Sequence, residues 1–216
     1  MSPGKIICTV QVLALTLLFA GCSKKASDEI DFGTLNNSVY RNEYFGFSAT
    51  FPKDWSVQDQ TAQRRLMKRG TQLIAGDDAN LKAMVKASEL QTVNLFAVFE
   101  HPVGSPVESN PNILSLAEQV RDMPGIKRGK DYFFQVRKML EAGQMQVEFP
   151  KDYYSERLGG VEFDVMELEI PVRGKTIKQK YYAAIQKGYA LSFIISFSTD
   201  DEAAALQKIL DSIAFH

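Results

Sequence analysis

The sequence predicts an α+β fold with a mostly antiparallel sheet and helices packed against it. Three observations support this class. Segments in which apolar and polar residues alternate are concentrated in the last third of the chain, and segments of helical period lie further upstream. The sequence ends with a predicted amphipathic helix. Of the 216 residues, about 195 remain once an export signal is removed, and this length suits one domain better than two.

The first two thirds of the chain predict helices and strands in alternation. In chain order, the predicted elements are two short strands within 39–57, a helix over 61–74, a helix over 79–90, a strand over 92–100, short helices over Ile113–Arg121 and Lys130–Ala142, and an alternating strand over 144–149.

A hairpin near the turn at 172–175 has a register that its charges specify. Val161, Phe163 and Val165 alternate with polar residues, and the parity then switches, which predicts a β-bulge at Val165–Met166. Pairing Val172 with Lys175 sets Glu169 opposite Lys178 and Glu167 opposite Lys180. Since a slip by one residue would lose both charge pairs, this is the predicted register.

The next hairpin is predicted to turn through three residues, Gln186 to Gly188, with glycine at the left-handed position. This register sets Tyr181 opposite Phe193. It leaves Tyr182 on the other face of the hairpin, beside small residues that would let a helix or a partner approach closely. Thr199 and Glu202 then form a capping-box pattern that opens the terminal helix.

The N-terminus has the three parts of an export signal. Lys5 gives a positive start, residues 6–20 are mostly apolar but too short to span a bilayer, and small residues precede Cys22. The segment Leu18-Phe19-Ala20-Gly21-Cys22 resembles the lipobox of bacterial lipoproteins, although Phe19 stands where that family usually has Leu. The alternative is an ordinary secreted protein with an incidental cysteine.

The lipobox resemblance implies that a lipid on Cys22 anchors the mature chain in the cell envelope. Ser23, rather than Asp, follows the cysteine, which favours the periplasmic face of the outer membrane if the host is Gram-negative. The predicted organisation is a signal peptide over residues 1–21, a lipidated flexible tether over 22–39 and a single globular domain over 40–216. The mature chain is near charge balance, at a formal charge of −2, so nothing indicates a nucleic-acid partner.

Two segments resemble PsbP-like domains. One is YRNEYFGFSATFPKDWSV, with Gly46, Phe47, Pro52 and Trp55, and the other runs from YYAAIQKGYALSF to the terminal helix, with Ser212 and Phe215 near the end. The resemblance covers about 18 residues at one end of the domain and 35 at the other. It implies an α/β/α sandwich used mainly as a binding module, and it carries no ligand residues.

No catalytic, metal or cofactor motif stands out. The chain has two histidines, His101 and His216, and too few nitrogen and sulfur ligands for a local zinc site. The predicted function is therefore a non-enzymatic, membrane-anchored accessory module that binds an envelope protein, without a cofactor. The alternative is an envelope hydrolase or small-ligand carrier whose site the sequence does not disclose.

The candidate partner-binding residues form a basic segment and one tyrosine. Arg64, Arg65, Lys68 and Arg69 lie within one and a half turns of a predicted helix, and Tyr182 lies on the far face of the last hairpins. The basic segment fits either a docking face for an acidic partner or an ordinary solvated helix face. Trp55 is predicted to be an aromatic anchor of the core rather than a ligand platform.

Overall fold

The computed structural model describes residues 30–172 and 174–216. The predicted signal peptide, Cys22 and the first part of the tether lie outside the described residues. In chain order the elements are β1 (Thr34–Asn36), β2 (Val39–Asn42), β3 (Phe47–Thr50), β4 (Ser56–Val57), α1 (Gln60–Ala75), α2 (Ala79–Gln91), β5 (Thr92–Phe99), β6 (Asn112–Gln119), α3 (Gly129–Ala142), β7 (Tyr154–Leu158), β8 (Val161–Val172), β9 (Lys175–Gln186), β10 (Tyr189–Phe197), α4 (Asp200–Asp211) and β11 (Ala214–Phe215).

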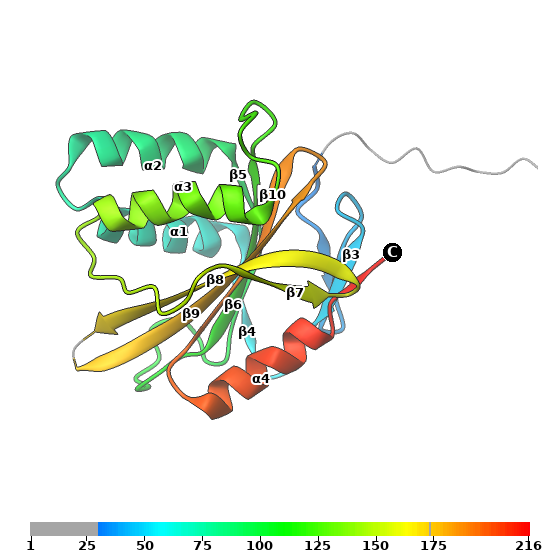
Figure 1. Ribbon diagram of the computed structural model, residues 1–216. Helices are drawn as coiled ribbons and strands as arrows, with labels where there is room; N and C mark the ends of the chain where they lie inside the picture. Colours follow the sequence, from blue (N-terminus) through cyan, green and yellow to red (C-terminus); the bar gives the residue numbers. More distant parts are fainter. Residues whose placement is uncertain (1–29, 173) are drawn as a thin grey trace, which may run out of the picture.

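A seven-stranded antiparallel sheet in the order β4-β5-β6-β10-β9-β8-β7 is the centre of the fold. Helices α1, α2 and α3 cover one face of this sheet, and α4 covers the other together with a small sheet in the order β1-β2-β3-β11 (Figure 1). The predicted α+β class and α/β/α layering are therefore confirmed.

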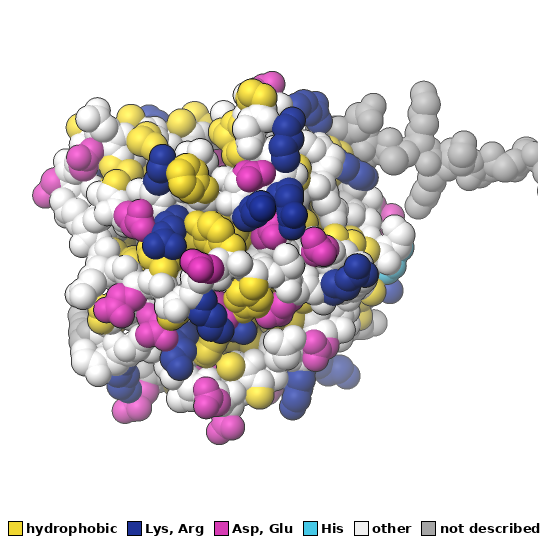
Figure 2. Space-filling model, viewed as in Figure 1, with side chains coloured by type: hydrophobic (Ala, Val, Ile, Leu, Met, Phe, Trp, Pro, Cys, Tyr) yellow, Lys and Arg dark blue, Asp and Glu magenta, His cyan; other side chains and the backbone are white. Residues whose placement is uncertain are grey.

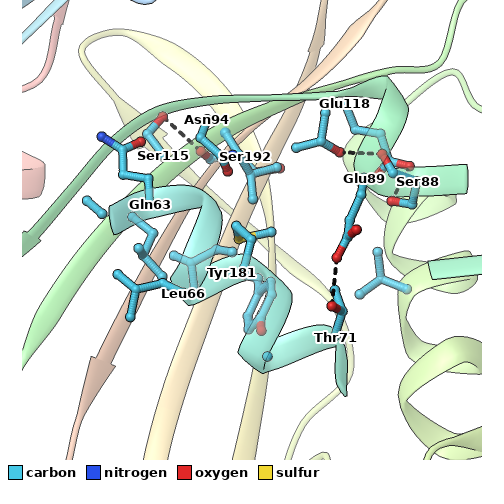
Figure 3. Close-up of a pocket in the computed structure, with 18 of the residues that line it drawn as sticks. Gln63, Leu66, Thr71, Ser88, Glu89, Asn94, Ser115, Glu118, Tyr181 and Ser192 are labelled. Atoms are coloured by element: carbon cyan, nitrogen blue, oxygen red, sulfur yellow. Dashed lines mark hydrogen bonds between the residues drawn. The ribbon is translucent and has the colours of Figure 1, made fainter. Parts of the chain in front are cut away.

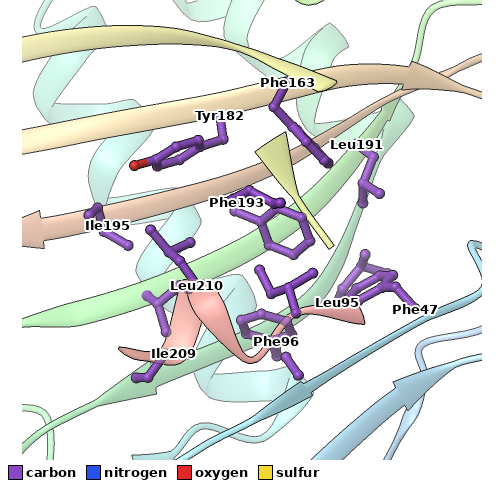
Figure 4. Packing of buried hydrophobic residues seen from close by; sticks show 14 of the residues in the cluster. Phe47, Leu95, Phe96, Phe163, Tyr182, Leu191, Phe193, Ile195, Ile209 and Leu210 are labelled. Atoms are coloured by element: carbon purple, nitrogen blue, oxygen red, sulfur yellow. The ribbon is translucent and has the colours of Figure 1, made fainter. Parts of the chain in front are cut away.

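The two faces of the sheet carry separate apolar cores. The larger core lies on the α4 side, where Phe193 packs edge-on against Phe47 and at 5.5 Å from Phe163, measured between ring centroids (Figure 4). The smaller core lies on the α3 side, where Phe133 and Met166 are buried. The core beneath α1, α2 and α3 is thus the smaller of the two.

Most of the predicted elements are confirmed. Three helices, α1, α2 and α3, begin and end within one residue of their predicted bounds. In the β8–β9 hairpin Glu169 pairs with Lys178 and Glu167 with Lys180, as the charge pattern predicts. The Thr199 hydroxyl accepts from the amide of Glu202 in a reciprocal capping box at the start of α4.

The predicted helix over Ile113–Arg121 is wrong, because most of this segment belongs to β6, an inner strand of the sheet. It pairs with β5 on one side and β10 on the other. Ile113 and Ala117 enter the larger core, while Leu116 is buried on the face covered by α1, α2 and α3. Because both faces are covered, apolar residues occupy both parities and the period of two is hidden.

The predicted bulge at Val165–Met166 is also wrong. The β8–β9 ladder runs from Asp164 to Val172 with no register shift. The change of parity has another cause: Phe163 and Val165 enter the larger core, whereas Met166 and Leu168 enter the smaller core on the opposite face. The two halves of one regular strand are covered on opposite sides.

The predicted register of the β9–β10 hairpin is wrong by one residue. The turn has two residues, Lys187 and Gly188, both with positive φ (52° and 83°), and Gln186 pairs with Tyr189. Such a turn matches the right-handed twist of the flanking strands, and a positive φ is readily adopted by glycine. Tyr182 therefore pairs with Phe193.

Two smaller differences concern the predicted boundaries. The tether was predicted to extend to residue 39, but β1 pairs with β2, and the Asp31 carboxylate accepts from the side chain of Asn42 and the amide of Tyr44. The domain therefore includes residues before 40. The alternating segment at 144–149 makes one isolated bridge, Glu148 to Glu169, and packs Val147 and Phe149 on the smaller core.

Candidate ligand cavity beneath the helices

A cavity of about 340 Å³ lies between the sheet and helices α1, α2 and α3; we call it the helix-side cavity. Most of its wall is apolar, including Leu66 and Met67 from α1, Val136 and Met139 from α3, and Leu114 and Ile194 from the sheet. Figure 3 shows lining residues from α1, α2 and the sheet. The volume of the cavity falls within the usual range of small-ligand pockets, about 300–1,000 Å³.

Small residues keep this space open. Gly70 lies in the interior of α1 on the cavity wall, and a Cβ added there would meet no atom within 4 Å. Glycine at such a position costs a helix roughly 0.5–1 kcal/mol relative to alanine. On the sheet, Ala97 and Ser192 stand where larger side chains would fill the cavity. At position 70 no neighbouring atom is close enough to exclude a larger side chain.

Two buried polar atoms of the lining have no hydrogen-bond partner in the protein. They are Oε1 of Gln63, whose residue is 5% exposed, and Oγ of Ser192, whose residue is 2% exposed. The amide nitrogen of Gln63 donates to the carbonyl of Gln58, so reversing the amide would set two oxygens against each other. An unmade hydrogen bond of this kind costs about 1–3 kcal/mol.

The other side of the cavity carries an acidic group in a satisfied network. Glu118 on β6 accepts hydrogen bonds from the hydroxyls of Ser88 (2.7 Å) and Tyr132 (2.8 Å). Burial, with Glu118 adding to it, raises the pKa of Tyr132 well above its ordinary value. In Figure 3 Ser88 and Glu118 lie away from Gln63 and Ser192, so the two kinds of polar group are separated along the wall.

Beyond Glu118 the cavity adjoins a wider groove between α2 and α3. Ser88, Glu118, Tyr132, Val136 and Met139 line both spaces. The rim of the groove exposes large apolar side chains, those of Met84 (60%), Phe134 (50%) and Met123 (38%). Hydrophobic side chains are visible over α2 and α3 in Figure 2, between charges of both signs.

Charge in the cavity wall is sparse and negative. Glu89 and Glu118 are the ionisable carboxylates among the lining residues; the wall contains no lysine, arginine, histidine or cysteine within the described part of the chain. Glu89 accepts from the hydroxyl of Thr71 at 2.7 Å. The described lining therefore offers no cation to pair with a bound anion and no imidazole for general acid–base catalysis.

The predicted basic segment is on the outer face of α1, apart from the interior of the cavity. Arg64, Arg65, Lys68 and Arg69 are all exposed, and none forms an ion pair with another described residue. Leu66 and Gly70 of the same helix face inward. The helix therefore separates a basic solvent face from an apolar cavity face.

Tyr182 is not an exposed partner-binding residue, and this prediction is corrected. Its side chain is fully buried in the larger core, on the α4 side of the sheet, because the two-residue turn sets it opposite Phe193. Burial raises the pKa of its hydroxyl far above the ordinary value. Trp55 is half-buried and packs on the edge of the same core.

The second basic motif, Lys127-Arg128-Gly129-Lys130, has a structural explanation. Arg128 pairs with the buried carboxylate of Asp164 at 3.2 Å, and the amide of Lys130 donates to the same carboxylate. A Cβ on Gly129 would lie 2.1 Å from the carbonyl oxygen of Ala183. These contacts hold the first turn of α3 against β8 and β9.

His101 lies in the loop after β5, where its amide donates to the side chain of Asn110. Over residues 30–172 and 174–216, no three histidine, cysteine, aspartate or glutamate side chains are grouped so that they could hold a metal ion. None of the described helices is both long and apolar enough to cross a membrane.

Comparison with solved structures identifies the fold. Cyanobacterial PsbP from Synechocystis superposes with a TM-score of 0.50 at 13% identity, over 82% of this chain and 91% of that one. The fold is PsbP-like. LpqN of Mycobacterium tuberculosis, described as involved in cell envelope biogenesis, aligns with a TM-score of 0.41 at 13% identity, over 78% of this chain and 82% of that one. Neither a protein-family model nor a curated protein matches the sequence.

The cavity residues Gln63, Gly70, Glu118 and Ser192 were not among the residues singled out from the sequence. One signal did point toward them: the small residues Ala190, Ser192 and Ser196 on one face of β10 predict close approach of a helix. Helices do cover that face. No sequence pattern predicts that they leave a cavity beneath them.

Proposed function

We propose that this PsbP-like domain is a non-enzymatic accessory module of the bacterial cell envelope that binds a small, largely apolar ligand in the helix-side cavity. The single observation that carries the proposal is an apolar cavity containing two buried polar atoms without partners, Gln63 Oε1 and Ser192 Oγ. A ligand that filled the cavity would bury apolar surface and could also meet these atoms, and both effects favour binding.

The non-enzymatic part of the proposal rests on the lining. General acid–base catalysis usually recruits histidine or a carboxylate free to exchange a proton. Histidine does not line the cavity within the described chain, and its two carboxylates, Glu89 and Glu118, both accept hydrogen bonds from hydroxyl groups of the protein. Binding without turnover is the simplest use of such a site.

The location in the envelope rests on the N-terminal sequence. Export and lipidation at Cys22 would hold the domain at a membrane surface, with several acyl chains contributing about 0.8 kcal/mol per buried methylene. The periplasmic face of the outer membrane is the proposed place if the host is Gram-negative. The domain would then bind its ligand next to a bilayer.

The test fills the cavity without disturbing the fold. In Gly70→Leu the new side chain would enter open space, and leucine is a better helix former than glycine. The matched control is Ala83→Leu, at an exposed position of α2 outside the lining. Binding is followed with N-phenyl-naphthylamine, an uncharged dye that fluoresces in apolar surroundings.

We expect the wild type and Ala83→Leu to bind the dye equally, and Gly70→Leu to bind it at least tenfold more weakly with no loss of melting temperature. Equal binding by all three proteins would place the dye elsewhere and contradict the proposal. No binding by the wild type would also contradict it.

A second function, docking to an acidic envelope protein, is supported by the basic face of α1. Arg64 and Lys68, and likewise Arg65 and Arg69, are like-charge pairs four residues apart, which destabilise a helix by about 0.2–0.5 kcal/mol each. In-cell photo-cross-linking from Arg65 and Lys68 tests this function. A single captured envelope protein should be lost when all four residues become Glu and retained in the control Lys86→Glu; capture that survives charge reversal would contradict it.

A further inference from the structure

The geometry points to the class of ligand: an uncharged amphiphile, an aliphatic chain bearing a head group that donates a hydrogen bond, such as a hydroxyl or a primary amide. This inference rests on the proposed function and adds the chemistry of the head group. Its basis is the unpaired acceptor of Gln63, the unpaired hydroxyl of Ser192 and the charges of the wall.

The acceptor of Gln63 requires a donor. Its Oε1 is buried, and its amide nitrogen is already committed to the carbonyl of Gln58 at 2.9 Å. A ligand with acceptors alone, such as an ether, would leave this oxygen unpaired. The hydroxyl of Ser192 both donates and accepts, so it places no such restriction. A hydroxyl or a primary amide suits both atoms.

The wall also excludes charge. A carboxylate or phosphate would enter a space without lysine or arginine in its described lining and with Glu89 and Glu118 on one side. Moving an ionised group out of water without a partner is strongly unfavourable. A cation would be attracted toward Glu89 and Glu118, which lie away from Gln63 and Ser192 (Figure 3), so it would leave the two unpaired atoms without a partner. The remaining class is neutral.

The apolar part of the ligand would lie along the inner faces of the helices. Leu66, Met67, Val136 and Met139 line the cavity, and methionine side chains adapt readily to flexible aliphatic chains. The adjoining groove, with exposed Met84, Met123 and Phe134 on its rim, offers an apolar route from the surface.

The experiment compares ligands that share one chain and differ in the head group. Displacement of N-phenyl-naphthylamine is measured at pH 8 with decanol, methyl decyl ether, decanoate and decyl phosphate. We expect decanol to bind about two- to tenfold more tightly than the ether, as for one neutral hydrogen bond. Decanoate and decyl phosphate should bind at least tenfold more weakly than decanol.

Two variants connect the preference to its residues. In Gln63→Leu the preference for decanol over the ether should disappear. In Ser192→Ala the affinity for decanol should fall about two- to tenfold while the melting temperature stays constant or rises, because an unpaired hydroxyl is removed. Ser48→Ala, on the small sheet across the molecule, is the matched control and should change neither quantity.

The outcomes separate this inference from the proposed function. If neither the dye nor any of the ligands binds, the proposed function and the head-group inference are both contradicted. If Gly70→Leu abolishes binding but the ether or decanoate matches decanol in the wild type, the cavity binds ligands and the head-group inference is overturned. Unchanged decanol affinity in both Gln63→Leu and Ser192→Ala would overturn it as well, and would mean that water serves these atoms.

Discussion

The substitution Glu167→Gln tests how the β8–β9 hairpin is held in register. The Glu167 side chain is 14% exposed. Its carboxylate accepts from the hydroxyl of Tyr154 (2.5 Å) and from the ammonium group of Lys151 (3.0 Å), and it forms an ion pair with Lys180 at 3.4 Å. Burial by itself would raise the pKa of this carboxyl. The hydrogen bonds from Tyr154 and Lys151 and the charge of Lys180 outweigh burial, so the pKa is lowered.

The magnitude follows from these contacts. Hydrogen bonds to a charged group contribute about 1.5–3 kcal/mol, and the partly exposed lysines place the expected loss near the lower end, at about 2 kcal/mol at pH 7. For a domain of this size each kcal/mol changes the melting temperature by about 2–4 °C, so the expected decrease is about 4–8 °C.

The direction of this pKa shift determines how the stability contribution of Glu167 depends on pH. Because the folded pKa of Glu167 lies below the unfolded value, its contribution is present above the unfolded pKa of about 4.3 and is lost as the pH falls through the folded pKa. The stability gap between wild type and Glu167→Gln should therefore be complete at pH 7 and close progressively below about pH 5.

Urea unfolding at a series of pH values measures this gap. The control is Glu108→Gln, which removes an exposed partner of Lys175 and should change stability little. A gap of the same size at pH 3 and pH 7, or no gap at pH 7, would refute the reasoning that the ionised carboxylate holds the hairpin.

Three further predictions concern the anchor, the helix glycine and the tryptophan. Cys22→Ser should move the protein from the membrane to the soluble fraction on cell fractionation; retention on membranes without a lipid would contradict the anchor. Gly70→Ala should raise the free energy of unfolding by about 0.5–1 kcal/mol in urea titrations, since α1 gains helix propensity and nothing obstructs the methyl group; a loss of stability would mean that the position is strained. Trp55→Ala should cost about 2 kcal/mol, less than a fully buried aromatic residue, because the ring is half-buried on the core edge; an unchanged melting temperature would mean that the ring contributes nothing to the fold.

The two hairpins show what sequence patterns determine and what they do not. The register of β8 and β9 was predicted correctly because opposite charges mark it, as in the pair Glu169 and Lys178. In β9 and β10 both faces are covered, so apolar residues meet in either register and the pattern does not choose between them. The observed register depends on a positive φ at Lys187. Non-glycine residues seldom adopt this conformation, so the sequence did not reveal it.

The cavity could not be predicted from the sequence, for a related reason. Gly70 and Ser192 are small residues, and a small residue is equally consistent with close packing and with an opening. What distinguishes the two is the distance at which α1 crosses the sheet, which depends on contacts made by the whole helix. The unpaired oxygen of Gln63 is likewise a property of the assembled structure, because the sequence does not reveal which side-chain atoms lack partners.

Native mass spectrometry of the full chain, purified from the membranes of its own host, tests the central claim most directly. The account predicts that the wild type and Ala83→Leu carry a bound uncharged amphiphile that Gly70→Leu lacks. Identical masses for the bound species in all three proteins, or no bound species in any of them, would contradict it.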